Sequence, residues 1–128
     1  MHNRIKRTPA ETAALLILNA ALYGEEKGRE VSRCRFTRQS LRQTSGWARL
    51  SQPFLDDLFE EMTALGWRLM EHSDTEFAMV LTSKMDVWPK IGNKRLGAMG
   101  LLKAPSEQIF QEYDERYPQS DDAIGDEE

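Results

Sequence analysis

An uncharged, almost wholly apolar segment over residues 12–22 constrains this chain more than any other feature of its sequence. Only Thr12 and Asn19 are polar within it. The residues directly before it, Thr8-Pro9-Ala10-Glu11, have the pattern of a capping box with proline at the first helical position. We therefore predict a helix from about Thr8 to Tyr23 that is apolar almost all round. Because such a helix has to be buried on more than one side, a later helix or a second subunit must cover it.

The same segment has some features of a secretory leader, because Arg4, Lys6 and Arg7 precede it as a basic flank would. Glu11, Asn19 and the helix-start pattern oppose that interpretation. No uncharged apolar run reaches the roughly 18–20 residues that are needed to span a bilayer. We therefore expect no membrane association and a location in the cytoplasm.

Turn signals and apolar periodicity divide the rest of the chain into further elements. The first helix is expected to end at Gly24, and Thr37 is expected to cap the next one. In chain order, the expected elements are a strand over residues 31–36, a helix over Arg38 to about Thr44, a turn at Ser45-Gly46-Trp47, a helix from Leu50 or Ser51 to Gly66, strands over Trp67–His72 and Thr75–Thr82, irregular structure over residues 83–104, and a helix from Pro105-Ser106 to about Tyr117. In the first strand, Cys34 and Phe36 share one face while Arg33 and Arg35 share the other, which indicates a half-buried strand.

Charge is strongly segregated along the chain, although the formal net charge is only −4. Residues 1–50 carry a net charge of +6, residues 51–83 carry −6, residues 84–104 carry +4 and residues 105–128 carry −8. Because such segregation creates local potentials that the net charge conceals, a basic surface for nucleic acid is compatible with this composition. Residues 118–128 are expected to form a disordered acidic tail.

Residue types that carry catalytic or metal-binding chemistry are scarce. The single cysteine, Cys34, excludes an intramolecular disulfide and lies at an apolar strand position, where an inert buried thiol is expected. Gly92 and Gly97 lack the Gly-Lys-Ser/Thr that gives a phosphate-binding loop its chemistry. Two histidines and one cysteine leave almost nothing for a zinc site. We expect no enzyme activity, no cofactor and no metal.

One stretch of the sequence has a recognisable order of residues. Phe36-Thr37-Arg38-Gln39-Ser40-Leu41 leads to a Ser-Gly turn, then to Leu50-Ser51-Gln52, and then to a helix that closes in Leu65-Gly66-Trp67. Over roughly residues 8–82 this order resembles the winged helix-turn-helix superfamily, which includes MarR-like and related bacterial regulators. The resemblance implies an α+β fold of helix, short strand, helix, helix and two-stranded wing, to which a C-terminal helix is added.

The sequence also leads to expectations about domain organisation and assembly. We expect a winged-helix domain with a basic post-wing segment over residues 1–104. A C-terminal helix over residues 105–117 is expected to pack on the first helix or on a second subunit. Since the first helix and residues 106–117 both have apolar surface to cover, a homodimer through these two segments is expected.

In that superfamily the third helix enters the major groove of DNA, and the hairpin wing contacts the backbone or the minor groove. The resemblance therefore implies contacts with double-stranded DNA from the start of the third helix and from its basic neighbours. The implied DNA-binding residues are Arg38, Gln39, Arg42, Arg49, Ser51, Gln52, Lys84, Lys90, Lys94 and Arg95.

Two acidic surfaces oppose DNA binding. The outward face of the third helix carries Asp56, Asp57, Glu60 and Glu61, and the expected wing tip over residues 71–76 carries three acids and no Lys or Arg. Phosphates repel carboxylates at both places. Two hypotheses therefore stay open. One is a small winged-helix DNA-binding transcriptional regulator, and the other is a winged-helix module that binds a protein partner through the acidic helix and wing.

Overall fold

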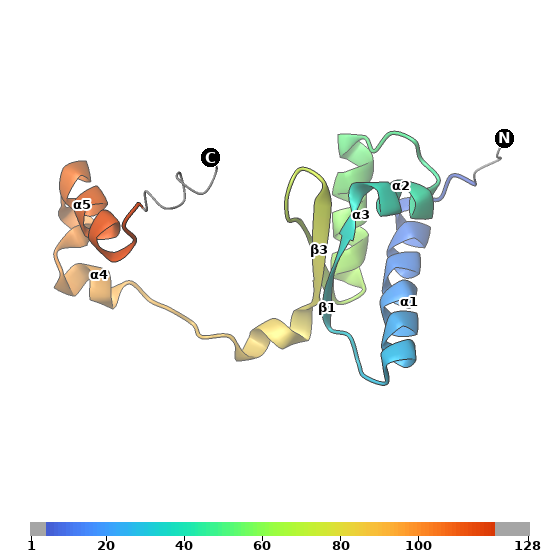
Figure 1. Cartoon of the computed structure of the whole chain (residues 1–128), viewed down its shortest axis with the longest axis horizontal. Helices are drawn as coiled ribbons and strands as arrows, with labels where there is room; N and C mark the ends of the chain where they lie inside the picture. The colour runs from blue at the N-terminus through green and yellow to red at the C-terminus, as the bar shows by residue number, and fades with distance from the viewer. Residues whose placement is uncertain (1–4, 120–128) are drawn as a thin grey trace, which may run out of the picture. The chain divides into compact units, whose positions relative to one another are not determined.

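The chain divides after Trp88 into two compact units, residues 1–88 and residues 89–128, in the computed structural model (Figure 1). The structure describes residues 5–119. The first unit combines helices with a three-stranded antiparallel sheet, so the α+β class is as predicted. The division falls before the expected boundary at residue 104, because residues 94–103 form short helices that contact each other in the second unit.

Helix α1 covers Pro9–Lys27 and starts at the predicted capping box. The Thr8 hydroxyl accepts a hydrogen bond from the Glu11 backbone N–H at 3.1 Å, and the Glu11 carboxylate accepts one from the Thr8 N–H at 3.1 Å. The predicted end at Gly24 is wrong. The helix continues to the left-handed cap at Gly28, where φ is 71°. Gly24 is instead a buried helical residue that the following loop approaches closely.

Strands β1 (Arg33–Thr37), β2 (Trp67–Glu71) and β3 (Glu76–Leu81) form the sheet, with β3 in the middle. Both pairings are antiparallel, and Met79 of β3 lies opposite Cys34 on one side and Leu69 on the other. The predicted alternation is confirmed in β1, because Cys34 and Phe36 are partly buried while Arg33 and Arg35 are exposed. Strand β1 begins two residues later than predicted.

Helices α2 (Arg38–Ser45) and α3 (Gln52–Ala64) are joined by residues 46–51. Thr37 caps α2 as predicted, because its hydroxyl accepts the Ser40 N–H at 2.9 Å. Helix α3 ends at Ala64 and not at Gly66, since Gly66 has a φ of 89°, which a right-handed helix excludes.

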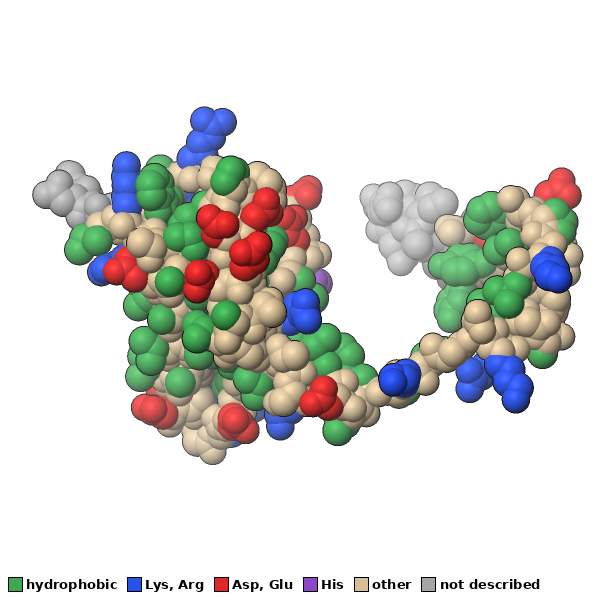
Figure 2. All heavy atoms as spheres, turned by 180° about the vertical axis from the view of Figure 1, so that it is seen from behind, with side chains coloured by type: hydrophobic (Ala, Val, Ile, Leu, Met, Phe, Trp, Pro, Cys, Tyr) green, Lys and Arg blue, Asp and Glu red, His purple; other side chains and the backbone are tan. Residues whose placement is uncertain are grey.

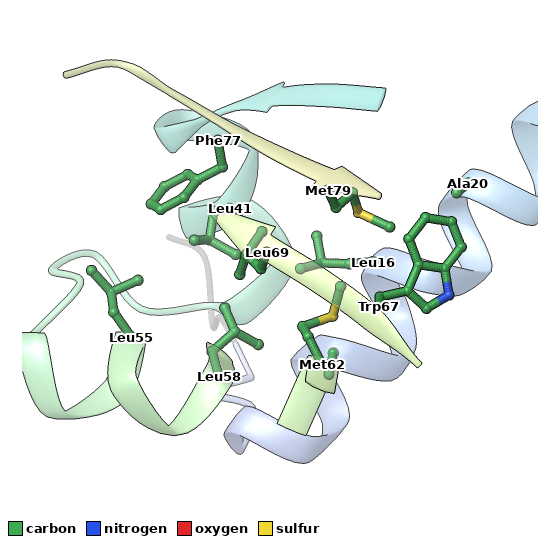
Figure 3. Close-up of a cluster of buried hydrophobic side chains, with 11 residues drawn as sticks. Leu16, Ala20, Leu41, Leu55, Leu58, Met62, Trp67, Leu69, Phe77 and Met79 are labelled. Atoms are coloured by element: carbon green, nitrogen blue, oxygen red, sulfur yellow. The ribbon is translucent and has the colours of Figure 1, made fainter. Parts of the chain in front are cut away.

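The core of the first unit lies between α1, α3 and the inner face of the sheet (Figure 3). Phe36 of β1 extends it, because its ring stacks on that of Phe77 with 5.7 Å between the centroids. The buried apolar residues are Ala13, Leu16, Ala20, Leu41, Leu55, Leu58, Met62, Trp67, Leu69, Phe77, Met79 and Val80. All of them belong to the first unit, so the hydrophobic free energy of folding is concentrated there.

Short helices replace much of the irregular structure that was predicted for residues 83–104. They are η1 (Thr82–Val87), which closes the first unit, and α4 (Lys94–Ala98) and η2 (Leu101–Lys103) in the second. The prediction was wrong because helices this short show no apolar period. Helix α5 (Ser106–Arg116) matches the predicted C-terminal helix. Of the predicted acidic tail, residues 120–128 lie outside the described residues.

In the second unit, no residue between 89 and 119 is buried. The large apolar and aromatic side chains of its C-terminal helix region are each more than two-fifths exposed, and they are Ile109, Phe110, Tyr113 and Tyr117. The packing predicted for residues 105–117 stays a prediction. None of the helices formed by residues 5–119 is long and apolar enough to cross a membrane.

Candidate nucleic-acid interface

Residues 5–7, the pre-helix segment, lie against the turn between α2 and α3. The Arg7 N–H donates to the Ser45 carbonyl oxygen at 2.8 Å, and the Trp47 indole N–H donates to the Arg7 carbonyl oxygen at 2.8 Å. Gly46 permits this approach, because its φ is 79° and a Cβ atom there would collide with the backbone of Ile5. The pre-helix segment is therefore hydrogen-bonded to the turn before α3 and fixed against it.

Trp47 is central to this arrangement. Its ring centroid lies 6.2 Å from that of Phe54 in the first turn of α3, and the Lys6 ammonium lies 4.9 Å from the centroid of the indole. The sequence alone suggested only a leader-like role for Lys6 and Arg7. It missed this contact because Arg7 and Trp47 are 40 residues apart and no local pattern joins them.

Arg38, predicted as a DNA-binding residue, connects α2 to the hairpin between β2 and β3. Its Nε–H donates to the Asp74 carbonyl oxygen at 2.9 Å, and its guanidinium lies 3.6 Å from a Glu71 carboxylate oxygen. The same guanidinium lies 4.9 Å from the centroid of the Phe77 ring. Arg38 is therefore a residue that positions the hairpin, and its charge is partly neutralised by Glu71.

The other two candidates on α2 differ from Arg38 in having no such partner. Gln39 is exposed and Arg42 is partly exposed. Arg49, in the turn before α3, is exposed as well. Within the described residues, neither Arg42 nor Arg49 takes part in an ion pair. In that part of the chain, Arg42 and Arg49 carry positive charge that no carboxylate compensates.

The start of α3 presents polar side chains that already have local partners. The Ser51 hydroxyl accepts the Phe54 N–H at 3.2 Å and so caps the helix. The Gln52 amide donates to the Asp56 carboxylate at 2.8 Å, one turn further along. Both residues are exposed. A base contact by Gln52 would have to replace or share its bond to Asp56.

Acidic side chains gather over α3 in the first unit, as Figure 2 shows in red. Asp56, Asp57 and Glu60 are exposed and Glu61 is partly exposed. These four residues are the acidic α3 face. They begin after the first turn, which contains no acidic residue. The helix therefore has an acid-free start followed by an acidic face.

Ion pairs make the hairpin less acidic than its sequence suggested. Glu76 lies 3.3 Å from the Arg35 guanidinium, and Glu71 lies 3.6 Å from that of Arg38. The sequence missed both pairs because the arginines belong to β1 and α2, far from the hairpin in the chain. Of the three acids predicted at the wing tip, two therefore have a cationic partner.

The remaining basic candidates belong to later elements of the chain. Lys84 is exposed in η1, at the end of the first unit. Lys90, Lys94 and Arg95 are exposed in the second unit. The predicted basic strip after the wing is thus divided between the two units.

A pocket of about 740 Å³ lies between α1, β1 and α2 in the first unit. Asn19, Tyr23, Ser40 and Thr44 contribute polar lining, and Cys34 lines it from β1. Cys34 is half-buried and not buried as expected, and this partial burial raises the pKa of its thiol above the ordinary value. Among residues 5–119, no group of three or more His, Cys, Asp or Glu side chains could hold a metal ion.

Comparison of the chain with protein-family models, with curated proteins and with solved structures finds no match in any of the three.

Proposed function

We propose that this chain is a small winged-helix protein of the cytoplasm that binds double-stranded DNA as a transcriptional regulator. Its proposed role is binding without catalysis. The order α1, β1, α2, α3, β2, β3, with β3 central in the sheet, is compatible with this fold. The observation that carries the proposal is the acid-free first turn of α3, with Arg49 in the turn before it and Arg42 in α2, neither of which has an ion-pair partner among the described residues.

The position of the acids supports this proposal more than their number suggests. Recognition helices contact bases mainly through their N-terminal residues. Here the first acid, Asp56, is one turn inside α3 and accepts a hydrogen bond from Gln52. The charge of Asp56 is therefore partly screened on the side that faces the start of the helix. The Arg35 and Arg38 ion pairs reduce repulsion at the hairpin in the same way.

The test is a titration of the protein against mixed-sequence duplexes at several salt concentrations. We expect affinity to fall steeply with salt, because phosphate contacts release condensed counterions. Arg42→Ala and Arg49→Ala should each weaken binding and reduce the salt slope by about one. Arg68→Ala is the matched control, because Arg68 is exposed on β2, which follows the C-terminal end of α3 and not its start. A protein that binds no duplex at low salt would overturn the proposal.

A second candidate function is favoured by the acidic α3 face. Three exposed carboxylates and one partly exposed carboxylate suit a basic protein partner. Under the DNA-binding proposal, changing Asp56 and Asp57 to Asn should tighten non-specific duplex binding by removing repulsion. Under the protein-binding alternative, the same variant should bind its partner more weakly, while Arg42→Ala should have no effect. The two functions therefore predict opposite results from one pair of variants.

We also propose that the protein is a homodimer in which α1 contributes to the interface. Leu15, Leu18 and Leu22 follow one another at helical spacing and are 36%, 56% and 56% exposed. Ala14 and Ala21 beside them are exposed and small, which lets a second helix approach closely.

The homodimer is tested by light scattering, which at micromolar concentration should give twice the mass of one chain. A Leu18→Glu variant should give the monomer mass, whereas Val87→Glu, at an 84% exposed site, should not. A monomer mass for the unaltered protein would contradict the homodimer.

A further inference from the structure

We propose that the pre-helix segment is part of the DNA interface, and that Lys6 and Arg7 contact the phosphate backbone next to the start of α3. This inference rests on the proposed DNA-binding function. It adds two contact residues that lie outside the helix-turn-helix segment and that sequence patterns did not indicate.

The backbone of Arg7 is held at both of its polar groups. Its N–H donates to the Ser45 carbonyl oxygen and its carbonyl oxygen accepts the Trp47 indole N–H, each at 2.8 Å. Because these bonds use only backbone atoms of Arg7, its side chain is not needed for the attachment. The segment is therefore fixed to the α2–α3 turn, while its side chains can serve another purpose.

The cationic side chains of the segment have no carboxylate partner in the described part of the chain. Lys6 is exposed, and its ammonium lies above the Trp47 ring. Arg7 is partly exposed, and neither residue forms an ion pair with another described residue. Two neighbouring cations without a carboxylate partner raise the electrostatic free energy of the protein alone. An anionic ligand bound at this place would compensate their charge.

The surroundings favour the same ligand. The sequence contains no Asp or Glu between residues 31 and 55, a stretch that includes β1, α2 and the turn to which the segment is attached. Arg49 belongs to that same turn and Arg42 to the helix before it. A regularly spaced polyanion can engage several such cations at once, which a single small anion cannot. We therefore assign the segment to the backbone of duplex DNA.

The decisive variant is Lys6→Ala with Arg7→Ala, measured for duplex affinity and its salt dependence. We expect weaker binding and a salt slope reduced by about two, because roughly one counterion is released for each phosphate contact. Lys27→Ala with Arg29→Ala is the matched control, since it removes the same charge near the far end of α1. That end lies about 28 Å from the start of the helix. The control should retain most of the salt slope.

A second variant tests the attachment. Trp47→Phe keeps an aromatic ring next to Phe54 and removes the N–H that holds the Arg7 carbonyl. It should lower duplex affinity without lowering α-helix content in circular dichroism. If Lys6→Ala with Arg7→Ala does not fold, the Gln double variant preserves the aliphatic stems and serves in its place.

The possible outcomes separate this inference from the function on which it rests. Absence of duplex binding by the unaltered protein would remove the proposed function itself. Normal duplex binding with an unchanged affinity and salt slope in the Lys6/Arg7 variant would overturn the inference and leave the DNA-binding function standing. Equal losses in the Lys6/Arg7 variant and the Lys27/Arg29 control would also overturn it, because the effect would then be one of overall charge.

Discussion

Cys34 shows how position in the fold sets the chemistry of a single side chain. The thiol lies in the pocket between α1 and β1, half-buried, and burial raises its pKa. We expect alkylation by iodoacetamide at pH 8 to be slower than for a free cysteine, because less thiolate is present. Adding denaturant should restore the ordinary rate. Rapid labelling of the folded protein at pH 8 would contradict this prediction.

The direction of the pKa shift also predicts a dependence of stability on pH. Because the folded pKa is raised, the unfolded chain ionises first as the pH increases through the ordinary thiol range, about 8.5. The contribution of the neutral thiol to stability is therefore complete below that range and is lost as the pH rises towards the folded pKa. Cys34→Ser should remove this alkaline loss.

Arg38 and Arg42 look equivalent in the sequence, but they should behave differently when they are replaced. Arg38 donates to the Asp74 carbonyl, pairs with Glu71 and covers the Phe77 ring. Arg38→Ala should therefore lower the free energy of unfolding by about 1–2 kcal/mol, since a charge-assisted hydrogen bond and a cation–π contact are lost together. Arg42→Ala should change it by less than about 0.5 kcal/mol, as expected for a surface site. Urea titrations of both variants make the comparison, and equal effects would show that Arg38 does not hold the hairpin.

At the scale of the element, Gly24 decides how α1 joins the loop that follows it. Alanine is normally better in a helix than glycine by about 1 kcal/mol. A Cβ atom on Gly24, however, would lie 2.5 Å from the carbonyl oxygen of Arg29, which is backbone that cannot move aside cheaply. Gly24→Ala should therefore destabilise the protein by about 1–3 kcal/mol, as overpacked sites do.

Gly97 provides the comparison for that prediction, because it is also a helical glycine. A Cβ atom there would lie 3.6 Å from Leu102 Cδ1, which is an ordinary contact. Gly97→Ala should be neutral or slightly stabilising. Thermal unfolding of both variants gives the measurement, and a stable Gly24→Ala protein would mean that the loop after α1 adapts.

Elements with a clear period or cap could be predicted from the sequence, and those without one could not. The capping box placed the start of α1, and the alternation around Cys34 placed β1. The prediction of a helix end at Gly24 is wrong because the local sequence does not show that the loop after α1 approaches this residue. The short helices between residues 82 and 103 have no period to detect.

The candidate site was predictable only in its local part. Ser51 and Gln52 follow from the helix-start pattern, and the structure places both at the start of α3. The bonds of Arg7 to the α2–α3 turn, the Arg38 contacts with the hairpin and the Arg35–Glu76 pair join residues far apart in the chain. Such contacts exist only after folding, so sequence patterns did not reveal that they fix the pre-helix segment and reduce the acidity of the hairpin.

For the whole molecule, the distribution of buried residues predicts that the first unit folds without the second. Among residues 5–119, every buried apolar side chain lies between Ala13 and Val80, and none of residues 89–119 is buried. A protein ending at Trp88 should unfold cooperatively, with a Tm within a few degrees of that of the full chain, as expected when no core residue is lost. Circular dichroism on heating provides the measurement. A broad or absent transition in the shortened protein would show that residues 89–128 stabilise the first unit.

The central position of β3 has a consequence for the order in which the sheet can be assembled. Strands β2 and β3 meet across a short hairpin, whereas Arg35 of β1 and Glu76 of β3, which form an ion pair across the two strands, are 41 residues apart. The ribosome synthesises the residues of β1 well before those of β3. Strand β1 therefore has no strand to pair with until the β2–β3 hairpin has emerged. Closing the longer loop also costs more entropy, so β1 should dock after the hairpin has formed. Truncating Phe36 should then mainly accelerate unfolding, while truncating Leu69 should slow refolding.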